Sequence, residues 1–458
     1  MKKIYICFFA ILAMFFKSQT LTLDASFGTN GIVKVPLLGE SDFTQIFLSQ
    51  DNKIIAFDKD IPSSISINPN KIYKFNLDGT LDASFGAGGV LTLPNYDGNF
   101  DVKMQGADKL LVIFQSTMYN STEMSVRRYH LDGTLDTSFA TDGEFKIDFS
   151  QNTGGFLQEK LIVLADNSLI LTIGGKYVKL FSDGKIDTSY GIDGVITSTN
   201  ISGHIINTGS GILNISNSEI KKTDYNAELD LNFGNNGVYT YSIGDDYIVK
   251  LNSSKNINAL GLDNKFYDID LSGKLLNTIN LTTEGGNIDY YTNHYFDGDN
   301  YYFVGTTSDG VPFIISYDKV GNLRKINGEN LYREMSVPAG DFSSLIKVGD
   351  VIYAGGYFSD SVTKKQYITI AKYSYTPSLG IKENTFSDSV NFENPMKTNI
   401  VFISKDNIEK IELYSIDGRL VKTIKKTGEN VSDLSKGVYV AKVFVSNGNV
   451  FMKKLLKN

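Results

Sequence analysis

The stretch Leu23–Val33, LDASFGTNGIV, decides the fold because the chain repeats it. Four further copies keep most of its residues: LDASFGAGGVL from Leu81, LDTSFATDGEF from Leu135, IDTSYGIDGVI from Ile186 and LDLNFGNNGVY from Leu229. Two degenerate copies follow, LLNTINLTTEG from Leu275 and LRKINGENLYR from Leu323. The copies start 43 to 58 residues apart. A period of about 50 residues indicates a repeat architecture, with the propeller blade as the leading candidate.

Each residue type in the repeat has a physical role. An aspartate such as Asp24 can accept hydrogen bonds from nearby backbone N–H groups and so start a tight turn. Phe27 supplies a large apolar wedge, and Gly28 and Gly31 suit the positive φ angles that other residues avoid. The run from Ile32 then starts a strand.

The repeated aspartates allow two interpretations. They could form a ring of ligands, or they could be turn caps that recur because the turn recurs. A repeated backbone already requires a repeated cap, so the sequence favours the second interpretation. The residues concerned are Asp24, Asp82, Asp136, Asp187 and Asp230.

Short strands fill the intervals between the copies. The first interval predicts four of them, at 33–37, 43–48, 54–57 and 71–77, separated by turn residues. No apolar stripe with a period of 3.6 residues is long enough to require a helix. The sequence therefore predicts an all-β fold.

The two ends of the repeat region complement each other. The last strand of each interval aligns on Phe75, Tyr129, Leu180, Thr223, Ile269, Tyr317 and Tyr373. The first copy of the repeat has no such strand before it, and the strand Thr369–Tyr375 has no copy after it. If that strand docks beside Leu23, the chain closes into a ring and exposes no open sheet edge. We therefore predict a seven-bladed β-propeller over residues 19–377. An open β-solenoid is the alternative, but it does not account for the complementary ends.

The LDxSFGxxGxV copies resemble the delta-60 repeats of bacterial secreted and surface proteins, which are similar to propeller blades. The resemblance covers roughly residues 21–376 and is carried by the five copies that keep the repeat. It implies a propeller and a secreted or surface location, and it implies no particular enzymatic activity.

Residues 1–18 have the pattern of a secretory signal peptide. Lys2 and Lys3 precede the apolar run Ile4–Phe16, which is too short to span a membrane as a helix. A buried first strand is the alternative, and we expect cleavage near Ser18. Cys7 is the chain's one cysteine, so a mature chain would form no disulfide and hold no thiolate metal site.

The composition is that of a soluble globular protein, with 41% hydrophobic and 21% charged residues. The net charge of −7 divides into +3 for residues 1–18, +4 for residues 381–458 and −14 for the rest. The strong negative charge of residues 19–380 argues against nucleic acid as a partner.

Candidate chemistry is sparse. His130, His204 and His294 lack metal-ligand spacing, and Asp297–Asn300 suits a hairpin turn better than a calcium loop. The Asp-Gly turns at Asp78, Asp132 and Asp183 resemble the Asp-box turns of sialidase propellers, but those turns bring a Trp and this chain has none. We predict no catalytic, cofactor-binding or metal residues and no cofactor.

Residues 381–458 predict a second domain, a small antiparallel β-sandwich. Strands at 408–416 and 419–424 flank Asp417-Gly418, and strands at 438–445 and 450–455 flank Asn447-Gly448. Both dipeptides are favoured two-residue hairpin turns.

This domain closely resembles the C-terminal sorting domain of the type IX (Por) secretion system of Bacteroidetes. The matching pieces are NPMKTNIVF from Asn394, IEKIELYSIDGRLVKTI from Ile408 and LSKGVYVAKVFVSNGNVFMKKLLK from Leu434. Glu393 departs from the family, which usually has Pro there. The resemblance implies export across the outer membrane by the type IX machinery, often with removal of the domain and attachment to the cell surface.

The sequence thus predicts a secreted or cell-surface propeller without a transmembrane segment in the mature chain, whose extracellular ligand is unknown. A binding or structural role is favoured, with a secreted glycan-acting hydrolase or lyase as the alternative. Catalysis would need paired carboxylates, or a base with an orienting partner, at one asymmetric site. The acidic residues of this sequence instead recur with the repeat.

Overall fold

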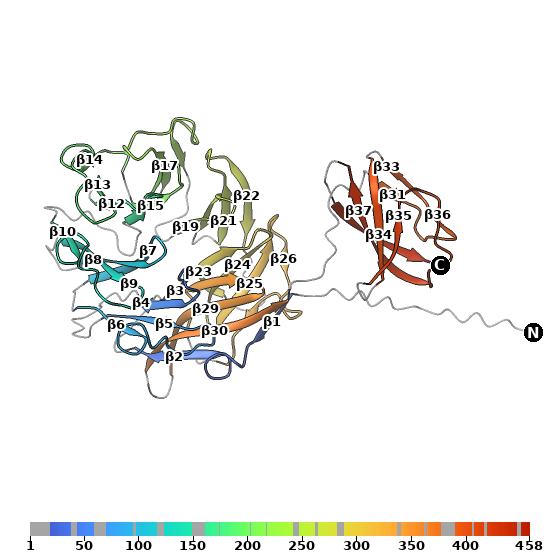
Figure 1. Cartoon of the computed structure of the whole chain (residues 1–458), viewed down its shortest axis with the longest axis horizontal. Coiled ribbons are helices and arrows are strands. Elements are labelled where there is room, and N and C mark those ends of the chain that lie inside the picture. The colour runs from blue at the N-terminus through green and yellow to red at the C-terminus, as the bar shows by residue number, and fades with distance from the viewer. Residues whose placement is uncertain are drawn as a thin grey trace, which may run out of the picture. The chain divides into compact units, whose positions relative to one another are not determined.

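Figure 1 shows the protein as a computed structural model. The chain divides into two compact units, Ser18–Pro377 and Ser378–Asn458. None of the described residues is helical, and the described part of the chain contains no helix that could cross a membrane. The structure describes residues 19–37, 44–58, 70–94, 98–116, 123–148, 161–173, 175–201, 203–216, 218–240, 247–261, 264–281, 288–336, 340–360, 363, 365–376, 390–404, 407–415, 419–446 and 450–458.

The described strands of the first unit form seven antiparallel sheets. Three of these sheets are built from β3 (Thr44–Leu48), β4 (Ile54–Asp58), β5 (Lys71–Phe75) and β6 (Val90–Thr92); from β7 (Gly98–Gln105), β8 (Lys109–Ser116), β9 (Glu123–His130) and β10 (Glu144–Asp148); and from β11 (Leu161–Val163), β12 (Leu169–Ile173), β13 (Lys176–Leu180) and β14 (Val195–Thr197).

Three more sheets follow in chain order. They are built from β15 (His204–Asn207), β16 (Ile212–Ile215), β17 (Glu219–Thr223) and β18 (Val238–Thr240); from β19 (Tyr247–Leu251), β20 (Ile257–Gly261), β21 (Lys265–Ile269) and β22 (Leu275–Asn280); and from β23 (Ile288–Phe296), β24 (Asn300–Thr307), β25 (Pro312–Asp318), β26 (Leu323–Arg324) and β27 (Tyr332–Arg333).

The seventh sheet joins the two ends of the unit. Its last strands in the sequence are β28 (Ser344–Val348), β29 (Val351–Ser359) and β30 (Gln366–Thr376), and β30 also pairs with β1 (Thr20–Leu23) and β2 (Ile32–Pro36). Leu23 lies opposite Tyr373 in the antiparallel register. The predicted docking of the last strand beside Leu23 is therefore confirmed.

The repeat connects the third strand of a sheet to its fourth. In the sheet β3–β6, Leu81 of the repeat forms a bridge with Phe75 at the end of β5, and β6 starts at Val90. Three other copies make the same bridge, through the pairs Tyr129–Leu135, Leu180–Ile186 and Thr223–Leu229. The repeat is thus the turn that positions the outer strand of each sheet.

Each sheet packs on the next through its own apolar core. The buried clusters join neighbouring sheets all the way round, and one of them joins β3–β5 to β29 and β30 through residues such as Ile54 and Ile370. Figure 1 shows the sheets following one another in chain order around the unit. This is a β-propeller, and the seven sheets of the described residues are compatible with the predicted seven blades.

The second unit is also antiparallel. It consists of β31 (Val390–Phe392), β32 (Asn399–Ile400), β33 (Phe402–Ser404), β34 (Ile408–Ser415), β35 (Leu420–Ile424), β36 (Glu429–Asn430), β37 (Gly437–Val445) and β38 (Val450–Lys457). A four-stranded sheet in the order β35-β34-β37-β38 accompanies the pairs β31–β33 and β32–β36, and Leu413, Val443 and Leu455 are among the residues of its core.

The four strands predicted in this unit are present within two residues of their expected bounds. The predicted turns at Asp417-Gly418 and Asn447-Gly448 lie outside the described residues, as does the predicted signal peptide.

Candidate functional sites

The repeat aspartates cap turns, as the sequence predicts. Asp82 Oδ1 accepts hydrogen bonds from the Ser84 backbone N–H at 3.2 Å and from the Ser84 hydroxyl at 2.7 Å. Asp24, Asp136 and Asp187 accept the same pair of bonds from the serine two residues on. Asp230 accepts one from the Asn232 backbone N–H at 3.1 Å.

Each of these aspartates also has a basic partner that the sequence reading missed. Each cation lies near the end of the third strand of its sheet, one residue before the position that Phe75 occupies in β5. Its nitrogen is within 3.6 Å of the carboxylate. The five pairs are Lys74–Asp82, Arg128–Asp136, Lys179–Asp187, Lys222–Asp230 and Lys372–Asp24. The recurring Lys or Arg was visible in the sequence, but a single basic residue in a strand resembles a solvated side chain until its neighbour is known.

The cation covers the buried aromatic ring of the repeat. Lys74 Nζ lies 5.7 Å from the centre of the Phe85 ring, and the Arg128 guanidinium lies 4.7 Å from that of Phe139. Both rings are fully buried. A cation over a desolvated ring is attracted by the negative face of the ring. Aspartate, cation and aromatic thus form one packed unit in these two repeats, and Lys179 over Tyr190 and Lys372 over Phe27 repeat the arrangement.

Four of these cations also donate to a backbone carbonyl of the next blade. Lys74 Nζ donates to the Leu131 carbonyl at 2.8 Å, which belongs to the turn after β9. The backbones of these neighbouring turns also touch, because Gly86 N donates to the Asp132 carbonyl at 2.7 Å. A Cβ on Gly133, which has a φ of +82°, would lie 2.8 Å from Gly86 N. The repeat therefore ties adjacent blades together.

The electrostatics of the repeat hold its carboxylates in the ionised form. Hydrogen bonds from Ser26 and from Lys372 lower the pKa of Asp24 to about 2. The Ser84 hydroxyl lowers the pKa of Asp82, and the Lys222 ammonium lowers that of Asp230. Ionised carboxylates that already accept these bonds are poor general acids.

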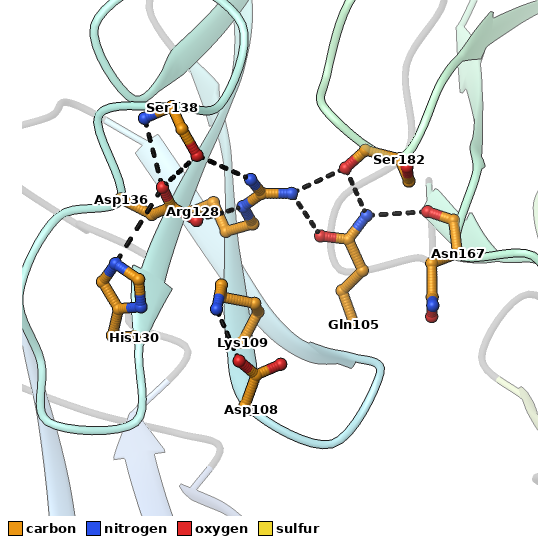
Figure 2. A network of polar contacts seen from close by, with 9 residues as sticks. All are labelled: Gln105, Asp108, Lys109, Arg128, His130, Asp136, Ser138, Asn167 and Ser182. Carbon is orange, nitrogen blue, oxygen red and sulfur yellow. Dashed lines mark hydrogen bonds and ion pairs between the residues drawn. The ribbon is translucent and has the colours of Figure 1, made fainter.

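Arg128 forms the most extended of these networks, shown in Figure 2. Its Nε donates to Asp136 Oδ2 at 2.8 Å, and its Nη1 donates to Gln105 Oε1 at 3.0 Å and to the Ser182 carbonyl at 2.6 Å. Gln105 Nε2 in turn donates to the carbonyls of Ser182 and Asn167. The network links the sheet β7–β10 to the sheet β11–β14.

A shallow depression of about 210 Å³ lies beside Arg128. Asp108 and Lys109 line it and pair with each other at 2.5 Å, and Asp183 on its wall pairs with Lys185 at 3.0 Å. These charges are matched within the protein, and the Arg128 charge is matched by Asp136. The charged groups around the depression thus already have partners within the protein.

The histidines lie apart from each other. His130 Nε2 is 3.9 Å from Asp136 Oδ1, and the side chain of His204 lies outside what the structure describes. His294 is buried in β23, and neither of its ring nitrogens has a hydrogen-bond partner among the described residues. Burial, with the nearby Lys250, lowers its pKa well below 6.5, so this imidazole is neutral.

Asp297 caps the turn between β23 and β24. Its Oδ1 accepts hydrogen bonds from the backbone N–H groups of Asp299 and Asn300, at 3.0 and 2.8 Å. Its Oδ2 accepts one from the Tyr302 hydroxyl at 3.0 Å and lies 3.2 Å from Lys347 Nζ. Within the described ranges, no group of three His, Cys, Asp or Glu side chains could hold a metal ion.

The NPM segment of the C-terminal unit binds the edge strand β38. Asn394 Oδ1 accepts a hydrogen bond from the Leu456 backbone N–H at 2.7 Å, and Asn394 Nδ2 donates to the Lys454 carbonyl at 3.2 Å. Met396 N donates to the Leu456 carbonyl, and the Met396 side chain is buried in the core. The first and last matching pieces of the sequence therefore meet in space.

Two family models match the chain. Residues 392–458 match the secretion system C-terminal sorting domain. Residues 66–85 and 108–139 match a domain of unknown function, DUF5122, that is described as a β-propeller. A search among curated proteins found no match.

Several solved structures are similar to this chain at 10–11% identity. BamB from Moraxella catarrhalis has a TM-score of 0.39, with 74% of this chain and 88% of that chain covered. Raptor from Chaetomium thermophilum has a TM-score of 0.49, with 79% and 30% covered. The structure titled "YCF48 bound to D1 peptide" has a TM-score of 0.44, with 76% and 98% covered. Similarities at this level have no bearing on function.

Fold and family matches together define the class, a β-propeller protein. This propeller carries a type IX secretion system sorting domain at residues 392–458, which indicates export to the cell surface or the extracellular space.

Proposed function

We propose that this protein is a delta-60-type propeller that works as a binding or structural module on the cell surface or in the medium. In this proposal residues 1–18 direct the chain across the inner membrane, and residues 381–458 direct it across the outer membrane. The observation that carries the proposal is the sorting-domain match over residues 392–458.

Two features of the structure support this division of roles. The matched residues fall in a compact unit of their own, as expected of a sorting signal that the type IX machinery recognises independently of the propeller. The propeller's repeat carboxylates are all engaged by cations and by turn hydrogen bonds, which favours a packing role for them over catalysis.

The test is cell fractionation with immunoblotting in a host that has the type IX machinery. Deletion of residues 381–458 should leave a folded propeller in the periplasm, and fusion of these residues to a periplasmic reporter should carry the reporter outside the cell. A truncated protein that still reaches the surface or the medium would refute the assignment.

Two point variants sharpen the same test. Leu413→Asp places a charge in the fully buried core of the sorting domain and should block export, because the domain would unfold. Ile403→Asp changes a side chain that is 76% exposed and should leave export unchanged. Equal export of both variants would contradict a role for the folded domain.

A further inference from the structure

A second shallow depression, a groove of about 610 Å³, lies where the repeat from Leu229 meets the turn after β21. It therefore lies between the sheets β15–β18 and β19–β22. Gly234 and Gly273 form part of its wall. The polar side chains that line it are Asn232, Asn235, Tyr239, Thr240, Ser272 and Lys274.

Comparison of the copies shows that this groove differs from its equivalents. This copy has Tyr239 near the start of the fourth strand. The other copies have an aliphatic residue or Phe at that position: Val33, Leu91, Phe145 and Ile196. Where the others have Thr, Ala or Ile in the turn, this copy has Asn235; the equivalents are Thr29, Ala87, Thr141 and Ile192.

Two further departures lie in the same groove. Asn232 replaces the serine that caps the aspartate in the other copies, Ser26, Ser84, Ser138 and Ser189. In three other copies the backbone N–H of the repeat donates to the backbone carbonyl of an aspartate in the next turn, Asp78, Asp132 or Asp183. Ser272 takes the place of that aspartate here. The repeat backbone is kept, because Gly234 N still donates to the Ser272 carbonyl at 2.7 Å. The shared turn therefore does not require these four residue types, although Tyr239 also packs against the core between the two sheets.

Four side chains that line the groove are open to solvent. Asn232, Asn235, Thr240 and Ser272 are exposed. The side chains of Asn235 and Thr240 make no hydrogen bond to any other described residue. The Ser272 hydroxyl donates to Asp270 Oδ1 at 2.6 Å, so its oxygen remains an acceptor. The Tyr239 ring is half-buried in the groove.

We propose that this groove binds a neutral oligosaccharide; the proposal rests on the proposed function, because it names the ligand class of that binding module. Amides and hydroxyls donate and accept hydrogen bonds, as the hydroxyls of a sugar do. A sugar also has a C–H face, which can lie against the negative face of a Tyr ring. No carboxylate lines the groove, and its one charged group is Lys274. Small-ligand sites combine an aromatic or apolar surface with a few polar groups, and this groove is lined by both kinds of side chain.

The test uses the full mature chain and a panel of immobilised neutral oligosaccharides built from glucose, galactose, mannose, fucose or N-acetylglucosamine. The double variant Asn235→Ala/Tyr239→Leu converts the groove to the residues of the second copy, Ala87 and Leu91, which the fold tolerates there. Thr92→Ala, at the position of the second copy that corresponds to Thr240, is the matched control. We expect the wild type and the control to bind at least one oligosaccharide, and the double variant to stay folded and to bind it at least tenfold more weakly.

Three results would overturn the inference. They are no binding to any member of the panel, binding that the double variant retains, and binding of a peptide or acidic-glycan panel at this groove in place of the neutral sugars. Because the assay uses purified protein, these results leave the export assignment untouched. A failure of export in the fractionation test would in turn leave the sugar result standing.

Discussion

The blades that carry the intact repeat and the two blades that lack it are held together by different chemistry. An intact blade uses a cation such as Lys74, which lies over Phe85 and pairs with Asp82. In the sheets β19–β22 and β23–β27 the position of that cation is taken by Asp268 and Ser316. The same third-strand position therefore carries opposite charge, or none, within one propeller.

Aromatic packing replaces the ion pairs in the region that lacks the repeat. The Phe266 ring lies 4.7 Å from that of Tyr301 and 5.0 Å from that of Phe303, both in edge-to-face geometry. Asp268 is buried beside them, accepts a hydrogen bond from Asn258 at 2.8 Å, and has a raised pKa because of its burial. Blade packing thus depends on filling the space between sheets, and a repeated ion pair is only one way to do so.

The largest effect is expected where the repeat fills that space. Phe85→Ala should lower the free energy of unfolding by ~3–5 kcal/mol, because the ring is fully buried between blades. Phe303→Ala, in the aromatic region, should cost a similar amount because that ring is equally buried. Chemical denaturation measures both losses. A loss of unfolding free energy below that range for Phe85→Ala alone would show that the repeat aromatic contributes little to the packing between blades.

The next effect concerns the buried cation. Arg128→Met should cost ~3 kcal/mol, because the Asp136 carboxylate and the Ser182 carbonyl lose their charged donor. Arg128→Met combined with Asp136→Asn should recover part of that loss. Lys109→Met, which breaks an exposed pair with Asp108, is the control and should cost less than ~1 kcal/mol. Equal costs for the two single variants would contradict a special role for Arg128.

Acid should lower the stability of the fold through His294, which lies in the aromatic region. Burial holds the pKa of His294 well below 6.5, so an unfolded chain binds a proton below pH 6.5 that the folded chain excludes. The free energy of unfolding should therefore fall as the pH drops below 6.5, by up to about 1.4 kcal/mol per pH unit for this group. His294→Phe should remove that slope, and His130→Phe should leave it in place. An unchanged slope in His294→Phe would contradict this reading of the buried imidazole.

The repeat aspartates respond at lower pH. Their folded pKa values are lowered, that of Asp24 to about 2 from 3.8. The stability they contribute is thus present above pH 3.8 and is lost as the pH falls toward 2. At neutral pH Asp82→Ala should cost ~1 kcal/mol, the value of a lost turn cap, because Lys74 keeps Asp51 as a partner at 2.8 Å. Unchanged stability together with a lost activity would instead make Asp82 a functional residue.

The sequence predicted most of the fold because its signals are local. Turn residues such as Asp82 and Gly89 recur at fixed places within the repeat, and the complementary ends predicted that Leu23 meets the last strand. The cation partners could not be assigned, because only the three-dimensional register shows that Lys74 reaches the repeat turn. The groove at Tyr239 was missed for a related reason. A tyrosine at the start of a strand is ordinary alone, and its meaning depends on Asn235 and Ser272 lying in the same groove.

Closure of the ring is the central claim, and one cross-link tests it directly. Thr22 lies opposite Ser374 in the antiparallel pairing of β1 with β30. Opposed residues in such a pair have Cα atoms about 4.5–5.5 Å apart, a separation that a disulfide can bridge. Because Cys7 is the one cysteine of the sequence, the mature double variant Thr22→Cys/Ser374→Cys would contain only the two introduced thiols.

We expect this variant to form an intramolecular disulfide in the folded protein under oxidising conditions, seen as a reduction-sensitive mass and mobility difference. The out-of-register control Thr22→Cys/Thr376→Cys should stay reduced, because diagonal neighbours are about 7–8 Å apart. Efficient cross-linking of 22 with 374 alone is the predicted result. Two free thiols in a folded 22/374 variant would contradict the closed ring.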